Sequence, residues 1–421
     1  MYADGDDVAR GRSCSPSTLR IVAKADDECC DGAHPWPTLV RMTLTAPTHD
    51  TGHPDLVFER ADELAAAGHE QVVFCRDAAT GLRAIIALHD TRLGPALGGT
   101  RFYPYATEAE ALTDVLRLSQ GMTHKAAAAG LALGGGKAVI IGDPATDKTP
   151  ELLAAYGRFV DSLSGRYFTA ADVGTTADDL DVVASVTPYV VGSNRGSGDS
   201  GPSTAYGVFC AMRAAAEHVW GPDGLRGRTV GVEGVGKVGA RLVGLLLQAG
   251  AEVVVSDPSQ DALARLLAEH PSVTARHAVL DAPVDVYAPC ALGATLTPTS
   301  VEAIRASVVC GAANNQLLDS SVAPLLQQRG ITWVPDYVAN AGGLIQVGGE
   351  IGARTPAEVR EDVAAIASTV RDILRRCEAS GRLTSEVADE IVAERLAAAP
   401  ARSARPTTPT TPTTLMTEAR A

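Results

Sequence analysis

Residues 229–257 read TVGVEGVGKVGARLVGLLLQAGAEVVVSD, and this stretch decides the fold of the second half of the chain. Gly234, Gly236 and Gly239 lie between a β-rich run and an amphipathic helix, and Asp257 ends the next β-rich run. This order of strand, glycine turn, helix and acidic residue is typical of a βαβ unit that binds a dinucleotide. The three glycines permit a tight turn, the approach of a pyrophosphate, and close packing of the helix on the strand.

The carboxylate of Asp257 bears on which dinucleotide binds. It can accept hydrogen bonds from both ribose hydroxyls and would repel a 2′-phosphate, which favours NAD over NADP. Pro258 follows it, so the alternative role is a turn or helix N-cap, and the two roles can coexist. The glycine run could also be a turn without a ligand. Asn314 and Asn315 can bond the nicotinamide carboxamide, although Asn after a strand is also common in turns.

Strand and helix signals alternate from about residue 200 onwards. The β-rich runs are RTVGVEG, AEVVVSD, VDVYAPC, SVVCGAA and ITWVPDY. This alternation predicts a parallel sheet with right-handed crossovers. Earlier in the chain, QVVFCRD and LRAIIALHD predict a hairpin, and Thr107 with Glu110 predict a helix opened by a capping box. We expect an α/β fold with two domains flanking a cleft: an N-terminal α/β substrate domain with a mixed sheet, and a Rossmann-type NAD domain.

Composition divides the chain into five parts. Periodic apolar patterns are missing near both ends, where Gly, Ser, Pro and Thr are frequent. The predicted parts are a disordered extension (1–52), the substrate and catalytic domain (53–195), the NAD-binding Rossmann domain (196–349), C-terminal helices that pack back toward the substrate domain (350–400), and a disordered tail (401–421).

The net charge and the cysteine pattern limit which binding partners the protein can have. The 421 residues carry a formal net charge of −14, which repels nucleic acid and anionic membranes. No apolar run is long enough for a membrane span, and no signal-peptide core is present, so we expect a cytoplasmic protein. The eight cysteines form no C-x-x-C pair, which favours buried thiols over a zinc site. We expect no metal, no nucleic acid and no membrane partner.

Two lysines and an aspartate are candidate catalytic residues. Lys125 lies near the end of the predicted helix, in GMTHK, and Lys137 follows three glycines that can bring backbone close to a ligand. Asp172 lies in TAADVGTT. Two ammonium groups in one cleft disfavour each other's charge, so one can act as a base while the other holds a carboxylate. For any single lysine, the alternative is a solvated surface charge.

Several strings resemble the glutamate/leucine/phenylalanine/valine dehydrogenase family, most closely its valine and leucine dehydrogenases. They are GPALGGTRFYPYATEAEALTDVLRLSQGMTHKAAAAGLALGGGKAVIIGDP, TAADVGTT, DVYAPCALGATL, CGAANNQL and PDYVANAGGLI. The resemblance implies that Lys125 binds the substrate α-carboxylate, that Lys137 is the general base, and that Asp172 handles the amino group. It further implies NAD-dependent oxidative deamination of a branched-chain L-amino acid (valine, leucine or isoleucine), and a homo-oligomer.

The resemblance also assigns the remaining contacts. Gly98 joins the substrate-binding residues, and Thr204 joins Asn314 among the cofactor-binding residues. The substrate side chain is expected to meet an apolar wall formed by Leu97, Ala170, Leu344 and Val347. A glutamate substrate would bury an unpaired charge against this wall, at a cost of several kcal/mol.

Alternatives to this function stay open. The four wall residues could be ordinary core residues. Phenylalanine dehydrogenases resemble the chain too, but tend to carry smaller residues at Leu97 and Val347. A non-catalytic NAD-binding sensor on the same fold is a third reading. Valine and leucine differ by one methylene, worth only about 1–3 kcal/mol, which the sequence does not resolve. Ala171, where many leucine dehydrogenases have glutamate, and the pair 348–349, where relatives usually have Ala-Asp, are departures that could broaden specificity.

Overall fold

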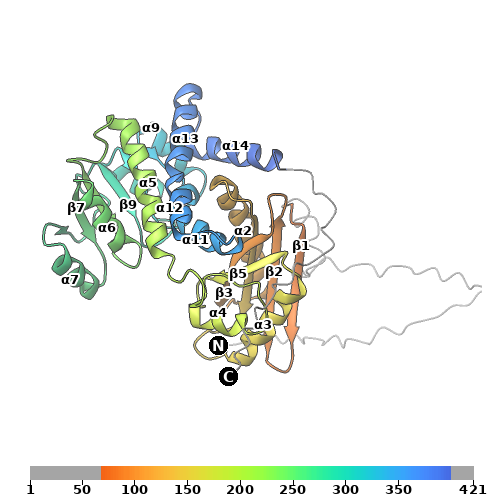
Figure 1. Cartoon of the computed structure of the whole chain (residues 1–421). Coiled ribbons are helices and arrows are strands. Elements are labelled where there is room, and N and C mark those ends of the chain that lie inside the picture. Colours follow the sequence, from red (N-terminus) through yellow and green to blue (C-terminus); the bar gives the residue numbers. More distant parts are fainter. Residues whose placement is uncertain (1–67, 400–421) are drawn as a thin grey trace, which may run out of the picture. The chain divides into compact units, whose positions relative to one another are not determined.

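The computed structural model describes residues 68–399, which form two β-sheets with their helices (Figure 1). The first sheet has five strands and the second has six. The predicted α/β class, with one mixed and one Rossmann-type sheet, is confirmed. The predictions for residues 1–52 and 401–421 fall outside the described residues.

The first sheet has the strand order β1-β2-β4-β3-β5. The predicted hairpin is its edge, where β1 and β2 pair antiparallel. β2 also runs antiparallel to β4, whereas β3 is parallel to both β4 and β5, so the sheet is mixed. The strands are β1 (Gln71–Asp77), β2 (Leu82–Asp90), β3 (Ala96–Tyr103), β4 (Gly134–Ile141) and β5 (Tyr167–Ala171).

Helices cover both faces of this sheet. On one face α2 (Glu108–Ala128) buries Leu112 and Val115 against apolar side chains of β2 and β4. On the other face α3 (Pro150–Ser162) packs with Tyr156 in the core. α4 (Ala177–Ala184) follows β5 and packs on α3. The alternation of side chains along each strand therefore fills two separate apolar layers.

The start of α2 forms only half of the predicted capping box. The hydroxyl oxygen of Thr107 accepts the backbone N–H of Glu110 at 3.1 Å. The carboxylate of Glu110, however, accepts the N–H of Ala106 at 3.2 Å rather than that of Thr107. One orphan donor of the first turn is still satisfied, so the helix begins where expected.

The three glycines before Lys137 are packed against protein. A Cβ on Gly135 would lie 2.1 Å from the backbone N of Thr123 on α2. A Cβ on Gly136, on the opposite face, would lie 2.8 Å from the ring of Tyr167. The expectation that these glycines bring backbone close to a ligand is wrong for these two positions, because the space is filled by neighbouring elements. They allow α2 and β5 to approach β4.

The second sheet is parallel throughout and has the order β11-β10-β9-β6-β7-β8. β6 is central: the chain adds two strands on one side and then three on the other, which is the doubly wound Rossmann order. Strands β10 and β11 are shorter than the β-rich runs predicted there, and β8 was not predicted. The strands are β6 (Thr229–Glu233), β7 (Glu252–Ser256), β8 (Thr274–Ala275), β9 (Val286–Pro289), β10 (Val308–Val309) and β11 (Thr332–Trp333).

Ten helices of the described chain follow residue 200. They are α5 (Gly201–Trp220), α6 (Gly239–Gln248), α7 (Gln260–Glu269), α8 (Pro298–Ala303), α9 (Val322–Gln328), α10 (Asp336–Ala339), α11 (Gly342–Ile351), α12 (Pro356–Ala364), α13 (Ile366–Ser380) and α14 (Thr384–Ala397). α12 and α13 pack on α5, whereas α14 packs on α2. On α14, the guanidinium of Arg395 donates to the carbonyl of Ala127 at 2.7 Å. The exact domain limits near residues 195 and 349 stay predictions.

Helix α11 holds the segment that joins the two sheets. The carboxylate of Glu350 accepts the backbone N–H of Gly192 at 2.9 Å and that of Ser197 at 2.8 Å. One turn earlier, the amide of Gln346 donates to the carbonyl of Ser197 at 2.9 Å. These contacts fix the connecting segment against a helix rather than leaving it as a free linker.

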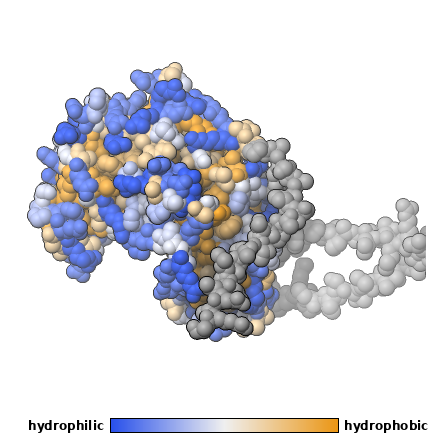
Figure 2. Space-filling view, viewed as in Figure 1, coloured by the Kyte–Doolittle hydropathy of each residue, from blue (hydrophilic) through white to orange (hydrophobic). Residues whose placement is uncertain are grey.

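Hydrophilic residues cover much of the face shown in Figure 2, with apolar residues between them. Half of the Phe74 side chain is exposed on β1, and Leu292 is 75% exposed. Five cysteines lie in the described chain; all are free thiols, and Cys75, Cys210 and Cys310 are buried. No helix within residues 68–399 is long and apolar enough to cross a membrane.

Gly98 supplies a test of the β3–β4 packing. A Cβ at this position would lie 1.7 Å from the carbonyl oxygen of Gly136, and backbone cannot move aside cheaply. We expect Gly98→Ala to lower the free energy of unfolding by about 2 kcal/mol or more. Gly121→Ala, on the exposed side of α2 where the Cβ meets open space, is the control and should be neutral or stabilising by up to about 1 kcal/mol. Urea unfolding measures both, and equal midpoints for the two variants would contradict the prediction.

Candidate active site

The first sheet brings Lys137 and Asp172 into direct contact. Lys137 lies on β4 and is 6% exposed, whereas Asp172 directly follows β5 and is partly buried. The Nζ of Lys137 lies 2.7 Å from Oδ2 of Asp172. Burial alone would raise the pKa of the Asp172 carboxyl, but the Lys137 ammonium and the Arg101 guanidinium outweigh it and hold this pKa below its usual range.

Lys125 lies in the last turn of α2 and faces the same region. Its Nζ donates to Oδ1 of Asn314 at 3.4 Å. Burial lowers the pKa of Lys125 to about 8; the carboxylate of Asp336 opposes this, and the charge on Lys137 adds to it. The shift places this ammonium within reach of titration slightly above neutral pH.

Asp336 and Asn340 complete the surroundings of Lys125. A carboxylate oxygen of Asp336 accepts the backbone N–H of Asn315, and burial raises the pKa of Asp336 despite the nearby Lys125. Asn340 is 4% exposed, and its amide donates to Asn314 Oδ1 at 2.9 Å. Its own Oδ1 is buried without a partner in the described structure. An unsatisfied buried carbonyl of this kind can accept a ligand N–H or a water.

A third cation, Arg101, lies behind the pair on β3. Its Nε lies 3.2 Å from Asp172 Oδ2, and its Nη1 lies 2.7 Å from Asp114 Oδ2 on α2. The hydroxyl of Tyr105 also donates to Asp114 Oδ2, at 2.6 Å. Charges of alternating sign therefore run from Asp114 through Arg101 and Asp172 to Lys137.

Sequence reasoning missed Arg101, Asp336 and Asn340. All three lie inside strings that carried the family resemblance, GGTRF and PDYVANAGG. The period of two along β3 places Arg101 on the same strand face as Gly99, and only the structure shows that a Cβ on Gly99 would lie 2.9 Å from the Cβ of Asp172. For Asp336 and Asn340 no local signal existed, because their partners are distant in sequence.

The predicted apolar wall forms one cluster. Leu97 is 1% exposed and Leu344 is 8% exposed, and the partly buried Ala170 and Val347 pack against them. β3, β5 and α11 contribute these residues, so the wall is assembled from both ends of the described chain. The cluster also holds Ala126, the residue after Lys125. The wall therefore lies beside the lysines rather than in a remote part of the core.

The departures at 348–349 have a packing explanation. A Cβ on Gly348 would lie 2.8 Å from Cδ1 of Leu133, and one on Gly349 would lie 2.7 Å from Cγ2 of Val359. Both glycines let neighbouring apolar side chains pack tightly on α11. The space behind the wall at these two positions is therefore filled by Leu133 and Val359. Nothing in the structure explains Ala171.

The three glycines of the second sheet differ in their surroundings. Gly234 has φ +94°, which suits glycine, at the turn after β6. Gly236 is exposed, and a Cβ there would meet nothing within 4 Å. A Cβ on Gly239 would lie 1.9 Å from the carbonyl oxygen of Gly234. The turn, the open position and the tight helix–strand contact are arranged as a pyrophosphate at the start of α6 requires.

Asp257 is tied to this glycine loop. Its Oδ2 accepts the N–H of Val235 at 2.8 Å, and its Oδ1 accepts the N–H of Ser259 at 2.8 Å. The cap of α7 is Ser259, so Asp257 serves as a turn residue and not as the N-cap. Each carboxylate oxygen keeps a lone pair, which leaves room for a ribose hydroxyl.

Thr204 lies in the first turn of α5, and its hydroxyl donates to the carbonyl of Ser200 at 3.0 Å. The start of α11 packs against it, since a Cβ on Gly343 would lie 2.7 Å from the Thr204 hydroxyl oxygen. Thr204 therefore joins α5 to α11. Asn314 is the predicted cofactor residue that the structure connects to Lys125.

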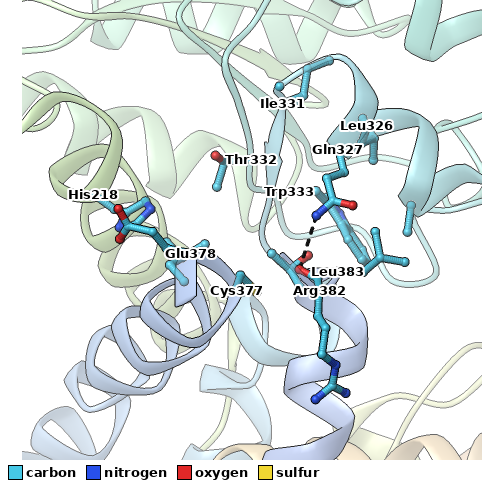
Figure 3. A pocket seen from close by; sticks show the side chains of 14 residues that line it. His218, Leu326, Gln327, Ile331, Thr332, Trp333, Cys377, Glu378, Arg382 and Leu383 are labelled. Atoms are coloured by element: carbon cyan, nitrogen blue, oxygen red, sulfur yellow. Dashed lines mark hydrogen bonds between the residues drawn. The ribbon is translucent and has the colours of Figure 1, made fainter. Parts of the chain in front are cut away.

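A cavity of about 300 Å³ lies elsewhere, at the edge strand β11 of the second sheet (Figure 3). Side chains of α5, α9, α13 and the start of α14 line it, and the amide of Gln327 donates to the carbonyl of Gly381 at 3.0 Å. It contains none of the predicted site residues. Among residues 68–399, no group of three or more His, Cys, Asp or Glu could hold a metal ion.

A parallel Rossmann-type sheet with a glycine loop is joined to a mixed sheet, where Lys137 on β4, Asp172 after β5 and Lys125 on the covering helix α2 lie close together. This combination defines a nicotinamide-dependent dehydrogenase of amino acids. The pattern of the Glu/Leu/Phe/Val dehydrogenase dimerisation domain matches residues 69–189, and that of Glutamate/Leucine/Phenylalanine/Valine dehydrogenase matches residues 259–399. The chain belongs to the glutamate/leucine/phenylalanine/valine dehydrogenase family, and the resemblance seen in the sequence is confirmed.

Individual relatives agree with this assignment. A valine dehydrogenase of Streptomyces albus is 52% identical over 84% of this chain and 100% of its own length. A leucine dehydrogenase of Bacillus cereus is 43% identical over 81% of this chain and 94% of its own length. The crystal structure of L-tryptophan dehydrogenase from Nostoc punctiforme is similar with a TM-score of 0.72 and 41% identity, covering 81% of this chain and 99% of that one.

Proposed function

We propose that this enzyme converts a branched-chain L-amino acid, NAD and water to the 2-oxo acid, ammonium, NADH and a proton. The observation that carries the proposal is the Lys137–Asp172 contact at 2.7 Å, with Lys125 on α2 and the apolar wall beside it. The Lys137–Asp172 pair can exchange protons with the amino group of a substrate, and the apolar wall beside it suits an amino acid with an apolar side chain. The valine dehydrogenases at 52% identity support the same substrate class.

Lys137 and Asp172 perform the proton transfers in this proposal. NAD, held by the glycine loop at Gly234–Gly239 and by Asp257, would supply the hydride acceptor for oxidation at the substrate Cα. Lys137 then acts as the general base and takes a proton from the water that attacks this carbon. Asp172, 2.7 Å from Lys137, receives protons from the substrate amino group and returns one as ammonia departs. The burial of Lys137 keeps bulk water from competing for its proton.

Lys125 holds the substrate carboxylate. Its ammonium is partly buried, so an ion pair with a carboxylate is screened less than on the surface. Asn314 and Asn340 lie within hydrogen-bonding distance of one another beside it and keep its position fixed. Gly98 can offer only backbone atoms to the substrate, because a side chain at this position would collide with Gly136.

The apolar wall selects the side chain. Leu97, Ala170, Leu344 and Val347 offer no cation to a second carboxylate, so a glutamate substrate would bury an unpaired charge. Gly348 and Gly349 are already packed against Leu133 and Val359, which argues against a widened pocket behind Val347. This favours aliphatic over aromatic substrates.

A panel of substrates tests the function. NADH formation followed at 340 nm should be efficient with valine, leucine and isoleucine, and roughly a thousandfold or more slower in kcat/KM with glutamate. Phenylalanine should be weaker than the aliphatic substrates. Phenylalanine as the best substrate would assign the chain to the alternative, phenylalanine dehydrogenase. NAD binding with no turnover of any amino acid would instead identify a sensor.

Replacing each lysine separates the two roles. Lys137→Ala removes the base, so kcat should fall about 10²–10⁴-fold while the Kd of NAD stays unchanged, because the glycine loop belongs to the other sheet. Lys125→Ala removes the carboxylate partner, so KM should rise strongly at pH 7. Two constants serve as controls: KM should change little in Lys137→Ala, and kcat should change little in Lys125→Ala. Near-normal kcat in Lys137→Ala with saturating substrate would refute its assignment.

The pKa of Lys125, lowered to about 8, adds a pH test of the same variant. Lys125 is charged below this pKa and loses its proton as the pH rises through it. The Kd of the 2-oxo acid should therefore increase above pH 8, by up to about tenfold per pH unit. In Lys125→Ala this dependence should disappear.

We propose that the dinucleotide is NAD, held by Gly234, Gly236, Gly239 and Asp257, with Thr204 and Asn314 contributing at the other end. Asp257→Ala should raise the ratio of kcat/KM for NADP to that for NAD by roughly tenfold or more, because one repulsive charge is removed. The ratio is informative because loss of the Val235 and Ser259 contacts affects both cofactors alike. Equal kinetics with both cofactors in the unmodified enzyme would defeat the assignment.

We also propose that the enzyme is a homo-oligomer. The family domain that matches residues 69–189 is described as a dimerisation domain. Within the first sheet β1 is an edge strand, and half of the Phe74 side chain is exposed on it. An edge strand with an exposed aromatic side chain is a surface that a second copy can cover.

A further inference from the structure

Arg101 shares a single carboxylate oxygen with Lys137. Its Nε lies 3.2 Å from Asp172 Oδ2, and Lys137 Nζ lies 2.7 Å from the same atom. The side chain of Arg101 is 22% exposed, so solvent screens this contact only in part. Oδ2 of Asp172 is thereby divided between a cation that can lose its proton and one that keeps its charge at any ordinary pH.

The division matters because a carboxylate opposes the loss of a proton from a neighbouring ammonium. If Asp172 faced Lys137 alone, its full charge would hold the proton on Nζ. A permanent positive charge on the same oxygen weakens that attraction and repels the ammonium directly. Arg101 therefore acts on Lys137 in the direction that a base requires, without contact with the reacting atoms.

Asp114 and Tyr105 control how strongly the charge of Arg101 acts on Lys137. The Nη1 of Arg101 lies 2.7 Å from Asp114 Oδ2, so part of its charge is neutralised from the side of α2. The hydroxyl of Tyr105 donates to the same carboxylate at 2.6 Å. Arg117 lies 3.1 Å from the other oxygen of Asp114. This anchoring keeps the guanidinium on β3 aligned with Asp172.

Other charged and titratable groups face the pair from neighbouring elements. They are Lys125 and Asp114 on α2, Arg101 on β3, Tyr167 on β5 and Asp336 on α10. Lys125 and Asp336 carry opposite charges and act on each other. Arg101 is the cation that contacts Asp172 together with Lys137.

We propose that Arg101 is a positioning residue, which fixes the Asp172 carboxylate and shares its charge so that Lys137 can release its proton. This inference rests on the proposed role of Lys137 as the general base. It assigns Asp114 an opposing role, because Asp114 draws charge away from the guanidinium.

The pH profile of kcat/KM tests the proposal with variants of opposite sign. Arg101→Gln removes the positive charge, so the acidic limb should move to higher pH by roughly one unit, with about tenfold lower activity at pH 8 and recovery at high pH. Asp114→Asn leaves Arg101 fully charged, so the limb should move to lower pH by a smaller amount. Arg101→Lys keeps the charge, and its limb should stay near that of the unmodified enzyme.

Arg228→Gln is the matched control. Arg228 lies 3.3 Å from Asp285, and this partly buried pair directly precedes β6 and β9 of the second sheet. Its removal should change the melting temperature but not the acidic limb. If Arg101→Gln does not fold, Asp114→Asn and Arg101→Lys still decide the question. A purely structural role would lower activity at every pH in both the Arg101 and the Asp114 variants and leave the limb in place, which would overturn the proposal.

Failure of this inference and failure of the proposed function are distinguishable. The acidic limb should be absent from the residual activity of Lys137→Ala, and its persistence there would refute the base assignment itself. If the limb is lost in Lys137→Ala but folded Arg101→Gln keeps the limb of the unmodified enzyme, only the role of Arg101 is wrong. An upward shift in Asp114→Asn would likewise overturn it.

Discussion

The packing of α2 against the glycines of β4 is the constraint on which the active site depends. A Cβ on Gly135 would lie 2.1 Å from the backbone of Thr123, so only glycine lets the helix come this close. Lys137 is two residues beyond Gly135 on the same strand face, and Lys125 is two residues beyond Thr123 on the helix. The contact therefore sets the separation of the two lysines, which electrostatics alone would drive apart.

The charges gathered there are tolerated because each has a partner. Asp172 lies against two cations, and Lys125 lies near Asp336 and Asn314. A buried charge without such partners would cost several kcal/mol. The arrangement still leaves capacity for a ligand, since Lys125 has a lowered pKa and Asn340 keeps an unpaired carbonyl oxygen. Under the proposed function, a substrate carboxylate and amino group would supply the missing partners.

Helix α11 connects the apolar wall to the segment between the sheets. One side of it carries Leu344 and Val347, and Gln346 and Glu350 bind the segment at residues 192–197. Its first residues also press against Thr204 at the start of α5, where two glycines permit close contact. The position of the wall thus depends on the same helix that fixes the connection to the second sheet.

The sequence by itself determined the Rossmann half, because its signals are local. The roles of Gly234, Gly236 and Gly239 follow from a strand–turn–helix unit of a few residues. The strand and helix periods around these glycines are also clear. The hairpin of β1 and β2 and the start of α2 were predictable for the same reason. The lysines and Asp172 could be named from motifs, but motifs carry no distances.

Only the tertiary structure decided what surrounds those residues. Arg101, Asp114 and Asp172 are brought together from β3, α2 and the end of β5, and Asp336 and Asn340 reach Lys125 from about 200 residues away in the chain. The expectation that the glycines before Lys137 admit a ligand is wrong at Gly135 and Gly136, because the sequence does not show which elements pack on the strand. Such contacts depend on strand order and helix packing, and these are set by the summed burial of the whole core rather than by any local pattern.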